Sequence, residues 1–526
     1  MQKYKMPISR LRMMVCLIGM LLPMCMFAQQ ITVQGVVKDQ TGETVIGASV
    51  MEKGTTNGTI TGIDGDFSLN MSSNGTLVVS FVGYKTQEVQ VKGQKQLQVV
   101  LSEDAEMLDE VVVIGYGTMK KSDLTGAVSS IGNKDIKDSP VSNLGQAIQG
   151  KISGVQIVDA GKPGDNVSIK IRGLGSINNC DPLVVIDGVP TDLGLSSLNM
   201  ADVERLDVLK DASATAIYGA RAANGVVMIT TKRGTEGKGK LAVSANYSFQ
   251  NATNVPSLLN AAQYAELSND MMVNSGRNPN PEWANPSELG AGTDWMDELL
   301  RTGVMQNYTV SYSGGNEKSH YYVSGGFLDQ SGIVKSVNYR RFTFQSNSDA
   351  QVLKWLKFSN NITFSADTKK SGSYNIGDAL KALPIYPVKN EDGSWSGPDG
   401  NSEWYGSTRN PIGPTELNKS QTDGYNFLAN LTAELTFTKW LKFKSTFGYD
   451  AKFWFIDNFT PKYNWKPTPT EETSRYKSDN KSFTYLWDNY FLFDHTFAEK
   501  HRVGLMAGMS AQWNTNDYLN AQKNVF

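Results

Sequence analysis

The residues that most often carry chemistry are poorly spaced for it in this sequence. Gly145 to Lys151 spells G-x-x-x-x-G-K, the phosphate-binding pattern, but Ile152 stands where a Ser or Thr would hold magnesium. The motif also lies in an amphipathic helical stretch rather than after a strand. No G-x-S-x-G occurs, and Gly173-Leu174-Gly175 is not followed by the third glycine of a dinucleotide site. We therefore assign no catalytic residue.

Metal and nucleic-acid chemistry are disfavoured as well. The three histidines form no H-E-x-x-H motif and the three cysteines no paired spacing, which argues against zinc. The Asp64-Gly65-Asp66 cluster lacks the further acidic positions of an EF-hand loop, so we expect a hairpin turn there. A net charge of -2 over 526 residues shows no excess of basic residues that could bind the phosphate backbone of a nucleic acid. We predict no metal, no cofactor and no nucleic-acid partner.

The N-terminus has the pattern of a secretory signal. Four basic residues in the first 12 positions precede an apolar run from Met13 to Phe27, which ends in Ala28. The run is shorter than the about 20 residues that a membrane-spanning helix needs. We predict a signal peptide over residues 1–28 with cleavage after Ala28. Cleavage removes two cysteines and leaves Cys180, which excludes an intramolecular disulfide.

Aromatic residues divide the sequence into two unlike halves. Seven of the 52 precede residue 240, whereas 45 follow it, among them all ten Trp. In the second half Val243, Ala245, Tyr247 and Phe249 share one face of an alternating segment. About nine or ten such segments have roughly the length of a tilted transmembrane strand. Since no later apolar stretch could cross a bilayer as a helix, a membrane role must rest on these strands.

Turns and loops between the alternating segments fit a barrel in a membrane. The run 354–358, Lys-Trp-Leu-Lys-Phe, recurs at 439–443, each time between two alternating segments. Trp beside Lys suits the membrane interface. The turn-rich stretches 254–302 and 371–424 are expected to be long loops on one side. A soluble β-sandwich or barrel is the alternative, because its strands also alternate.

The aromatic-poor half contains two further units. From Ile31 to Leu101 short β-branched pieces are broken by Gly turns, which predicts a small β-sandwich. From Val141 to Gly234 apolar strands mix with short helical pieces, which predicts a compact α+β domain. The expected fold is thus mainly β: a sandwich, an α+β domain and the first part of an antiparallel transmembrane β-barrel.

Several runs in this half stand out: Leu108 to Gly117, Ile171 to Ser176, Pro182 to Pro190, Val208 to Ala214 and Tyr218 to Gly234. These runs, and the order of the units, resemble the N-terminal portion of the SusC/RagA family of TonB-dependent outer-membrane receptors. Leu108 to Gly117 resembles the TonB box of that family, and the other runs resemble successive plug blocks. Within the last of them, Ala223 to Gly234 is similar to the signature that closes the plug. The implied organisation is a signal peptide, 1–28; a carboxypeptidase-regulatory-like sandwich, 29–103; a TonB box and linker, 104–118; a plug, 119–236; and a partial barrel, 237–526.

The resemblance implies TonB-dependent import of large nutrients, oligosaccharides or peptides, across the outer membrane. The sandwich and plug would lie on the periplasmic side, and a SusD-like surface lipoprotein and TonB with ExbB and ExbD would be the protein partners. The expected TonB contacts are Leu108, Asp109, Glu110, Val111, Val112 and Val113. Arg172 and Arg221 are expected to be buried and paired inside the plug. We assign no substrate-binding residue, because barrel aromatics are more often girdle residues.

Three other functions remain open at this point. A surface adhesin or other β-rich binding protein would share the signal and strands, but has no use for a TonB box and plug. A secreted glycan-active enzyme would need a carboxylate pair, which 52 acidic residues do not exclude. A truncated receptor is the third, because plugged transporters close with about 22 strands. Asn520, Gln522 and Asn524 stand where a terminal membrane strand would carry apolar residues, so we expect a cut C-terminus and no transport by the chain alone.

Overall fold

A computed structural model describes residues 30–524 of the protein except 41, 56, 82–83, 103–110, 115–116, 121–127, 138, 140, 160, 176–179, 212–214, 399–403, 465–468 and 499. The chain divides into two compact units, Met1–Leu124 and Thr125–Phe526. The predicted signal peptide and its cleavage site, Ala28, lie outside the described residues.

Unit 1 contains the predicted β-sandwich. One sheet has the strand order β4-β1-β7 and the other β3-β2-β5-β6. Their facing side chains form one core in which Val33, Val37, Leu77 and Val79 are fully buried. The strands are β1 Gln30–Asp39, β2 Ser49–Glu52, β3 Gly58–Ile60, β4 Asp66–Ser72, β5 Thr76–Ser80, β6 Gln87–Gln90 and β7 Gln96–Leu101.

The Asp64-Gly65-Asp66 cluster forms a turn in this sandwich. Gly65 has a φ of +70°, which a residue with a side chain rarely adopts. The turn connects β3 with β4, and these strands belong to different sheets. It therefore links the two layers, and the expected hairpin at this point was wrong.

Unit 2 begins with the predicted α+β domain, which we call the plug. Its main sheet has the order β10-β15-β16-β13-β14, and β11 pairs with β12 beside it. Buried Ile, Leu and Val side chains from both sheets and from the short helices form a single core. The elements are β10 Val128–Gly132, α3 Asn133–Lys137, α4 Leu144–Ile148, β11 Val155–Val158, β12 Ser168–Ile171, β13 Leu183–Ile186, β14 Val189–Thr191, η2 Leu195–Ser197, η3 Met200–Asp202, β15 Val203–Leu209, η4 Ala216–Ala222 and β16 Val226–Thr231.

The G-x-x-x-x-G-K run lies in and after α4, and packing explains its first glycine. A Cβ added to Gly145 would lie 2.0 Å from Val167 Cγ2, so a larger residue does not fit. Asn143 caps the helix by accepting a hydrogen bond from Gly145 N at 2.8 Å. Lys151 Nζ donates to Ser139 Oγ at 2.9 Å.

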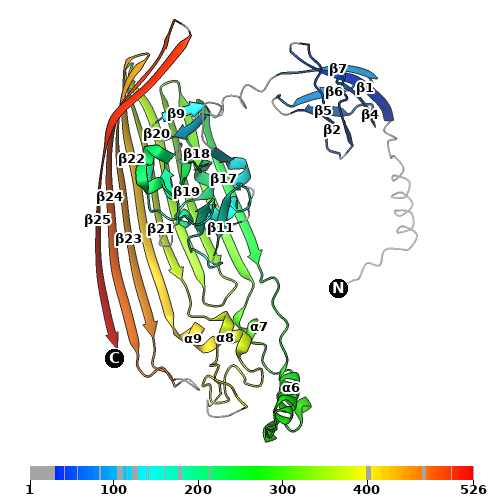
Figure 1. Ribbon diagram of the computed structural model, residues 1–526, viewed down its shortest axis with the longest axis vertical. Helices are drawn as coiled ribbons and strands as arrows, with labels where there is room; N and C mark the ends of the chain where they lie inside the picture. The colour runs from blue at the N-terminus through cyan, green and yellow to red at the C-terminus, as the bar shows by residue number, and fades with distance from the viewer. Residues whose placement is uncertain are drawn as a thin grey trace, which may run out of the picture. The chain divides into compact units, whose positions relative to one another are not determined.

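In the described part of unit 2, nine consecutive strands form one antiparallel sheet, in agreement with the nine or ten predicted. Figure 1 shows this sheet curving around the plug. The strands run for 13 to 24 residues, longer than most globular strands. They are β17 Gly237–Gln250, β18 Gly303–Asn316, β19 Ser319–Ser331, β20 Asn338–Leu353, β21 Leu356–Lys370, β22 Lys419–Thr438, β23 Leu441–Thr460, β24 Ser474–Phe497 and β25 His501–Asn524.

Connections at the two ends of this sheet differ in length. At one end β20 and β22 each reach the next strand through a Lys-Trp pair, at 354–355 and 439–440, so the repeated pentapeptide marks two tight turns. At the other end the long connections carry helices, which lie together beyond the sheet in Figure 1. These are α6 Ala261–Asn274, η5 Pro281–Trp283, η6 Pro286–Leu289, α7 Trp295–Leu299, α8 Ile376–Lys381 and α9 Ile412–Leu417.

These long connections contain a hydrophobic core of their own. Trp295, Leu299, Val334, Ala379 and Ile412 form a separate buried cluster there. The expected loop 371–424 was too long, because Lys419 already begins β22 and strand alternation continues to that point.

We expect Leu77→Ala to destabilise the sandwich by about 3 kcal/mol, because it empties a fully buried site in a small core. Hydrogen exchange of the full chain would measure this as faster exchange of β2 and β5 amides. Amides of β15 and β16, in the other compact unit, provide the internal control. Equal acceleration in both units would contradict the prediction.

Candidate functional site

Alternation along the strands gives the sheet two faces with different chemistry. On β20 Tyr339, Arg341, Thr343, Gln345 and Asn347 are buried, and all face the plug side. The residues between them, Phe342 and Phe344 among others, are exposed on the opposite face. A polar inner face and an apolar outer face are typical of a strand in a membrane barrel. The plug therefore meets a largely polar inner face, which also contributes Leu428 and Leu486 to the plug core.

Asp202 of the plug is bonded to β19 by two hydroxyl groups. Tyr322 Oη donates to its Oδ1 at 2.8 Å and Ser324 Oγ donates to the same atom at 2.5 Å. All three side chains are almost fully buried. Burial raises the pKa of Asp202, although both hydroxyl bonds and the charges of Lys232 and Arg341 oppose the shift. Through this contact the Asp202 carboxyl group, which lies in a low-dielectric environment, attaches the plug to β19.

A second contact surrounds the end of β16. Asn347 Nδ2 donates to Thr231 Oγ1 at 2.6 Å and to Lys232 O at 2.7 Å. Thr231 Oγ1 itself donates to Asp187 Oδ2 at 2.6 Å, and Asn430 Nδ2 of β22 donates to Asp187 O at 2.7 Å. Burial raises the pKa of Asp187, against the charge of Arg233 and the bonds from Thr231. One plug corner is thus bonded to β20 and β22 together.

Arg341 and Tyr339 hold a third part of the plug. Arg341 donates through an Nη atom to Ser196 O, and Tyr339 Oη donates to the same oxygen at 3.3 Å. The Tyr339 ring packs against Gly164, whose φ is +78°. A Cβ at Gly164 would lie 2.2 Å from the ring, so glycine is required by both backbone and space.

The plug loop around Gly164, residues 161–166, also reaches the end of the sheet that carries the helices. Asp165 Oδ1 forms an ion pair with Lys369 Nζ of β21 at 2.8 Å. Lys162 Nζ lies 5.0 Å from the centre of the Tyr374 ring, within cation–π range. Asn143, the cap of α4, donates to Asp165 O at 3.1 Å. The loop therefore couples the plug interior to the connection that follows β21.

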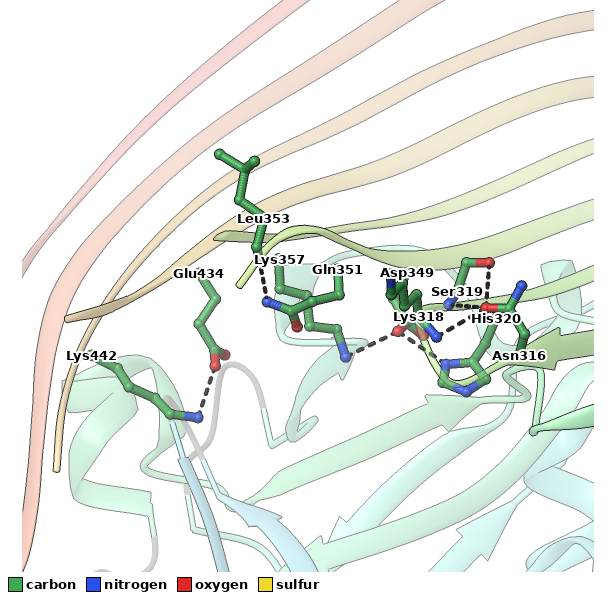
Figure 2. A network of polar contacts seen from close by, with 10 residues as sticks. All are labelled: Asn316, Lys318, Ser319, His320, Asp349, Gln351, Leu353, Lys357, Glu434 and Lys442. Carbon is green, nitrogen blue, oxygen red and sulfur yellow. Dashed lines mark hydrogen bonds and ion pairs between the residues drawn. The ribbon is translucent and has the colours of Figure 1, made fainter. Parts of the chain in front are cut away.

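At the turn end of the sheet a ladder of polar and charged side chains crosses β19 to β23 (Figure 2). Asp349 Oδ2 lies 3.1 Å from His320 Nδ1 and 3.0 Å from Lys357 Nζ. Lys357 stands directly opposite Glu434, which pairs with Lys442 at 2.9 Å. Opposite charges on neighbouring strands favour one register. The ladder stabilises the strand alignment on which the inner contacts depend.

The two plug arginines are paired but exposed, so the expectation that they are buried was wrong. Arg172 forms an ion pair with Asp211, and half of its side chain is accessible. Arg221 is also exposed and donates to Gln512 Oε1 of β25. A guanidinium at the plug surface can pair with a neighbouring side chain and stay hydrated, so the pairing of these arginines does not require that they be buried. Cys180 is a buried thiol.

The polar residues near the end of β25 face the plug side of the sheet. Gln512 contacts the plug, and the register with β24 is unbroken, so alternate residues up to Asn524 share its face. Asn520, Gln522 and Asn524 are inner-face residues of an ordinary alternating strand. Their polarity is therefore explained by the face on which they lie.

A cavity of about 510 Å³ separates the plug from the first two strands of the sheet. Ser244, Asn246 and Ser248 of β17 line it together with Asn307 and Thr309 of β18. Asn199 of the plug donates to Thr309 Oγ1 at 3.1 Å at its border. The cavity shows that the plug fills the inside of the sheet unevenly.

Half of the predicted TonB-contact segment can be located. Leu108, Asp109 and Glu110 lie outside the described residues. Val111, Val112 and Val113 belong to β8, Val111–Ile114, which pairs antiparallel with β9, Gly117–Lys120. Among the described residues β9 is the sole strand partner of β8. The other edge of β8 is therefore without a described strand.

In the described ranges, no helix has both the length and the hydropathy to cross a bilayer. In the same ranges, no three His, Cys, Asp or Glu side chains gather in a way that could hold a metal ion.

The sequence patterns did not identify the residues that attach the plug to the sheet. Asp202, Thr231, Arg341 and Asn347 were not singled out, although polar residues at every second position of β20 mark a buried polar face. Alternation could have placed Arg341 and Asn347 on the inner face of the sheet. Their partners lie more than 100 residues away, and local pattern does not specify such contacts.

A plug bonded to the inner face of a long-stranded antiparallel sheet is the architecture of a TonB-dependent receptor. Residues 120–226 match the TonB-dependent Receptor Plug Domain, and residues 33–113 match the CarboxypepD_reg-like domain. The TonB-dependent receptor SusC of Bacteroides thetaiotaomicron is 40% identical over 81% of this chain and 44% of that protein. TonB-dependent receptor P3 of Formosa agariphila is 34% identical over 92% of this chain and 48% of its own length.

Solved structures agree with this class. The RagAB peptide importer in its open-open state superposes with a TM-score of 0.68 at 25% identity, covering 79% of this chain and 50% of that chain. Over most of its length the chain is homologous to TonB-dependent receptors of the SusC type and shares the fold of RagAB. It spans about half the length of the curated relatives it matches.

We expect Gly164→Ala to loosen the plug more than Gly161→Ala does. Both glycines have a positive φ, so each substitution costs about 1 kcal/mol in backbone strain. Only Gly164 also faces a ring, which should add about 1–3 kcal/mol of overpacking. Faster hydrogen exchange in residues 161–171 of the Gly164 variant would show this. Equal exchange in the two variants would rule out the ring contact as the cause.

Plug attachment should weaken as pH rises through the raised pKa of Asp202. The folded state holds this proton more tightly than the unfolded chain, so the stabilisation is complete below the ordinary value of 3.8 and is lost above the raised one. Asp202→Asn keeps an oxygen acceptor but does not ionise. We expect hydrogen exchange of residues 200–209, corrected for its intrinsic pH dependence, to increase with pH only in the natural chain, by up to about tenfold per pKa unit. An identical pH profile in the variant would contradict this.

Proposed function

We propose that the chain forms the plug and nine strands of a TonB-dependent importer that takes large nutrients, oligosaccharides or peptides, across the outer membrane. The observation that carries the proposal is how the plug is attached. Side-chain hydrogen bonds and a few ion pairs join it to the sheet, besides the packing of Leu428 and Leu486 on the plug core, and the contact of Asp202 with Tyr322 and Ser324 is almost fully buried. Each such bond is worth about 1 kcal/mol net, so a pulling force can break them one after another while the sheet stays intact.

The force would enter through residues 108–113. The outer membrane holds no ATP, so work must reach the plug mechanically. A partner strand can add to an exposed edge by main-chain hydrogen bonds, and β8 has one edge without a strand among the described residues. We assign this pairing to TonB, driven by ExbB and ExbD through inner-membrane proton flow. Leu108, Asp109 and Glu110 would extend the paired strand on its N-terminal side.

The remaining assignments follow from the same mechanism. The barrel lies in outer-membrane lipid, with the sandwich and plug on the periplasmic side and a SusD-like lipoprotein at the outer surface. The domains run over 29–103, 104–118, 119–236 and 237–526, after a signal peptide cleaved at Ala28. The 40% identity to SusC supports the class of transport, and the polar inner face supports a hydrophilic substrate.

Deletion of residues 108–113 should abolish uptake and leave substrate binding at the cell surface intact. Val112→Pro should have nearly the same effect, because proline removes a main-chain donor from the pairing strand. Val112→Thr is the matched control and should keep most uptake, because it preserves the backbone and β propensity. Transport assays with labelled nutrient in cells that carry each variant in the native gene would measure this. Unchanged uptake in the deletion would refute the proposal.

A further inference from the structure

The outer face of the four adjacent strands β22 to β25 carries a long span without charged residues (Figure 1). On β24 Leu486, Asp488 and Tyr490 are buried on the plug side, so the alternate residues from Phe483 to Phe497 point outward. None of these outward residues is Asp, Glu, Lys or Arg. The same holds for their outward partners, which lie within 427–435 of β22, 441–451 of β23 and 503–515 of β25. A strand crosses the apolar part of a bilayer with such a span.

Two polar side chains interrupt the middle of this span. Ser445 and Asn489 stand directly opposite each other on β23 and β24. Ser445 Oγ donates to Asn489 Oδ1 at 2.7 Å, and Trp487 Nε1 donates to Ser445 Oγ at 3.2 Å. No described residue accepts a hydrogen bond from Asn489 Nδ2. The amide therefore presents N–H donors to lipid, which has no acceptor for them at this depth, and such a group is costly.

An amide can satisfy a second copy of itself. It has two N–H donors and an oxygen that accepts two hydrogen bonds. About a two-fold axis beside Asn489, each Nδ2 would donate to the Oδ1 of the other copy, which still accepts from Ser445. Small side chains flank this pair, Ala433 on β22 and Ala507 and Ala511 on β25, and small residues let two membrane surfaces approach closely.

The span is also large enough for a stable contact. Four strands about 4.8 Å apart, and residues 483–497 at about 3.3 Å each, cover about 19 Å by 46 Å, or roughly 900 Å². Each partner of a stable interface buries about 800 Å². Exposed apolar side chains supply most of this surface, among them Leu431, Phe447, Trp487, Phe491 and Met509.

We propose that this face, centred on Asn489 and Ser445, joins two copies of the chain about a two-fold axis in the outer membrane. Lipid chains offer Asn489 Nδ2 no acceptor. An unrelated membrane protein would have to carry a polar side chain at the same depth. A second copy of the chain places its own Asn489 there by symmetry.

The inference rests on the proposed function only in that the outer face lies in lipid. It goes beyond that function, because neither TonB pairing nor the attachment of the plug involves the outer face. Cross-linking of two copies needs no import, so the two proposals can fail separately.

Cysteine cross-linking in isolated outer membranes tests the two-fold contact. A residue beside the axis meets its own copy, and a disulfide forms when the two Cα atoms are within about 7 Å. We expect oxidation of Asn489→Cys to give at least tenfold more cross-linked dimer on a non-reducing gel than the natural chain, whose Cys180 is buried.

Asn360→Cys is the matched control. Asn360 also points outward, and Ser348 of the neighbouring strand donates to its Oδ1. It lies on β21, three strand spacings or about 14 Å from β24, so a two-fold axis beside Asn489 would hold its two copies about 28 Å apart. It should give no more dimer than the natural chain.

The mass of the full chain purified in detergent provides a second measurement. The natural chain should be a dimer, Asn489→Leu should raise its dissociation constant severalfold, and Asn489→Gln, which keeps an amide, should recover most of the affinity. A monomeric natural chain would contradict the proposal.

Three cross-linking results would also overturn it: no dimer from Asn489→Cys, as much dimer from Asn360→Cys, or a product that contains a different protein. The 108–113 deletion should cross-link through Asn489→Cys as the full chain does. If that deletion cross-links and still imports, only the transport proposal fails. If it neither cross-links nor imports, only the dimer proposal fails.

Discussion

The two-residue period of the β-strand is the constraint on which unit 2 depends. Lipid offers no partner to backbone N–H and C=O groups, so a chain that crosses it as strands must pair every strand with its neighbours. Pairing then sends alternate side chains to opposite faces. The outer face of β17 to β25 can be apolar and the inner face polar only because the register is kept over strands as long as 24 residues. A slip of one residue would exchange the two faces, and the ion pairs between Asp349 and Lys357 and between Glu434 and Lys442 oppose such a slip.

That constraint also determines how the plug is held. Main-chain groups of the sheet are used within the sheet, so the plug is held largely by the side chains of the inner face. Asp202, Asp187 and Ser196 each meet hydroxyl, amide or guanidinium groups from β19, β20 or β22. Such contacts are individually modest but costly to leave unsatisfied, so together they favour one seated position of the plug. A domain seated in this way can be released by force, whereas one joined by a continuous sheet could not.

Much of the architecture follows from local pattern. The sandwich, the plug and the long strands were predictable because β-branched runs, Gly turns and alternation report on neighbours close in sequence. The Lys-Trp repeats marked tight turns for the same reason. Errors occurred where the outcome depends on distant partners. Arg172 and Arg221 reach partners while exposed, and β22 begins before Gly424.

The sequence by itself determined which residues could share a face, because alternation, turn chemistry and the burial of apolar side chains operate over a few residues. The resemblance of the TonB-box and plug runs to a known family could likewise be recognised from the sequence. Only the tertiary structure decided which faces meet. It brought Asp202 to Tyr322, Thr231 to Asn347, and Ser445 to Asn489. Those meetings depend on the register of nine strands and the seating of the plug within them, which are properties of the whole sheet.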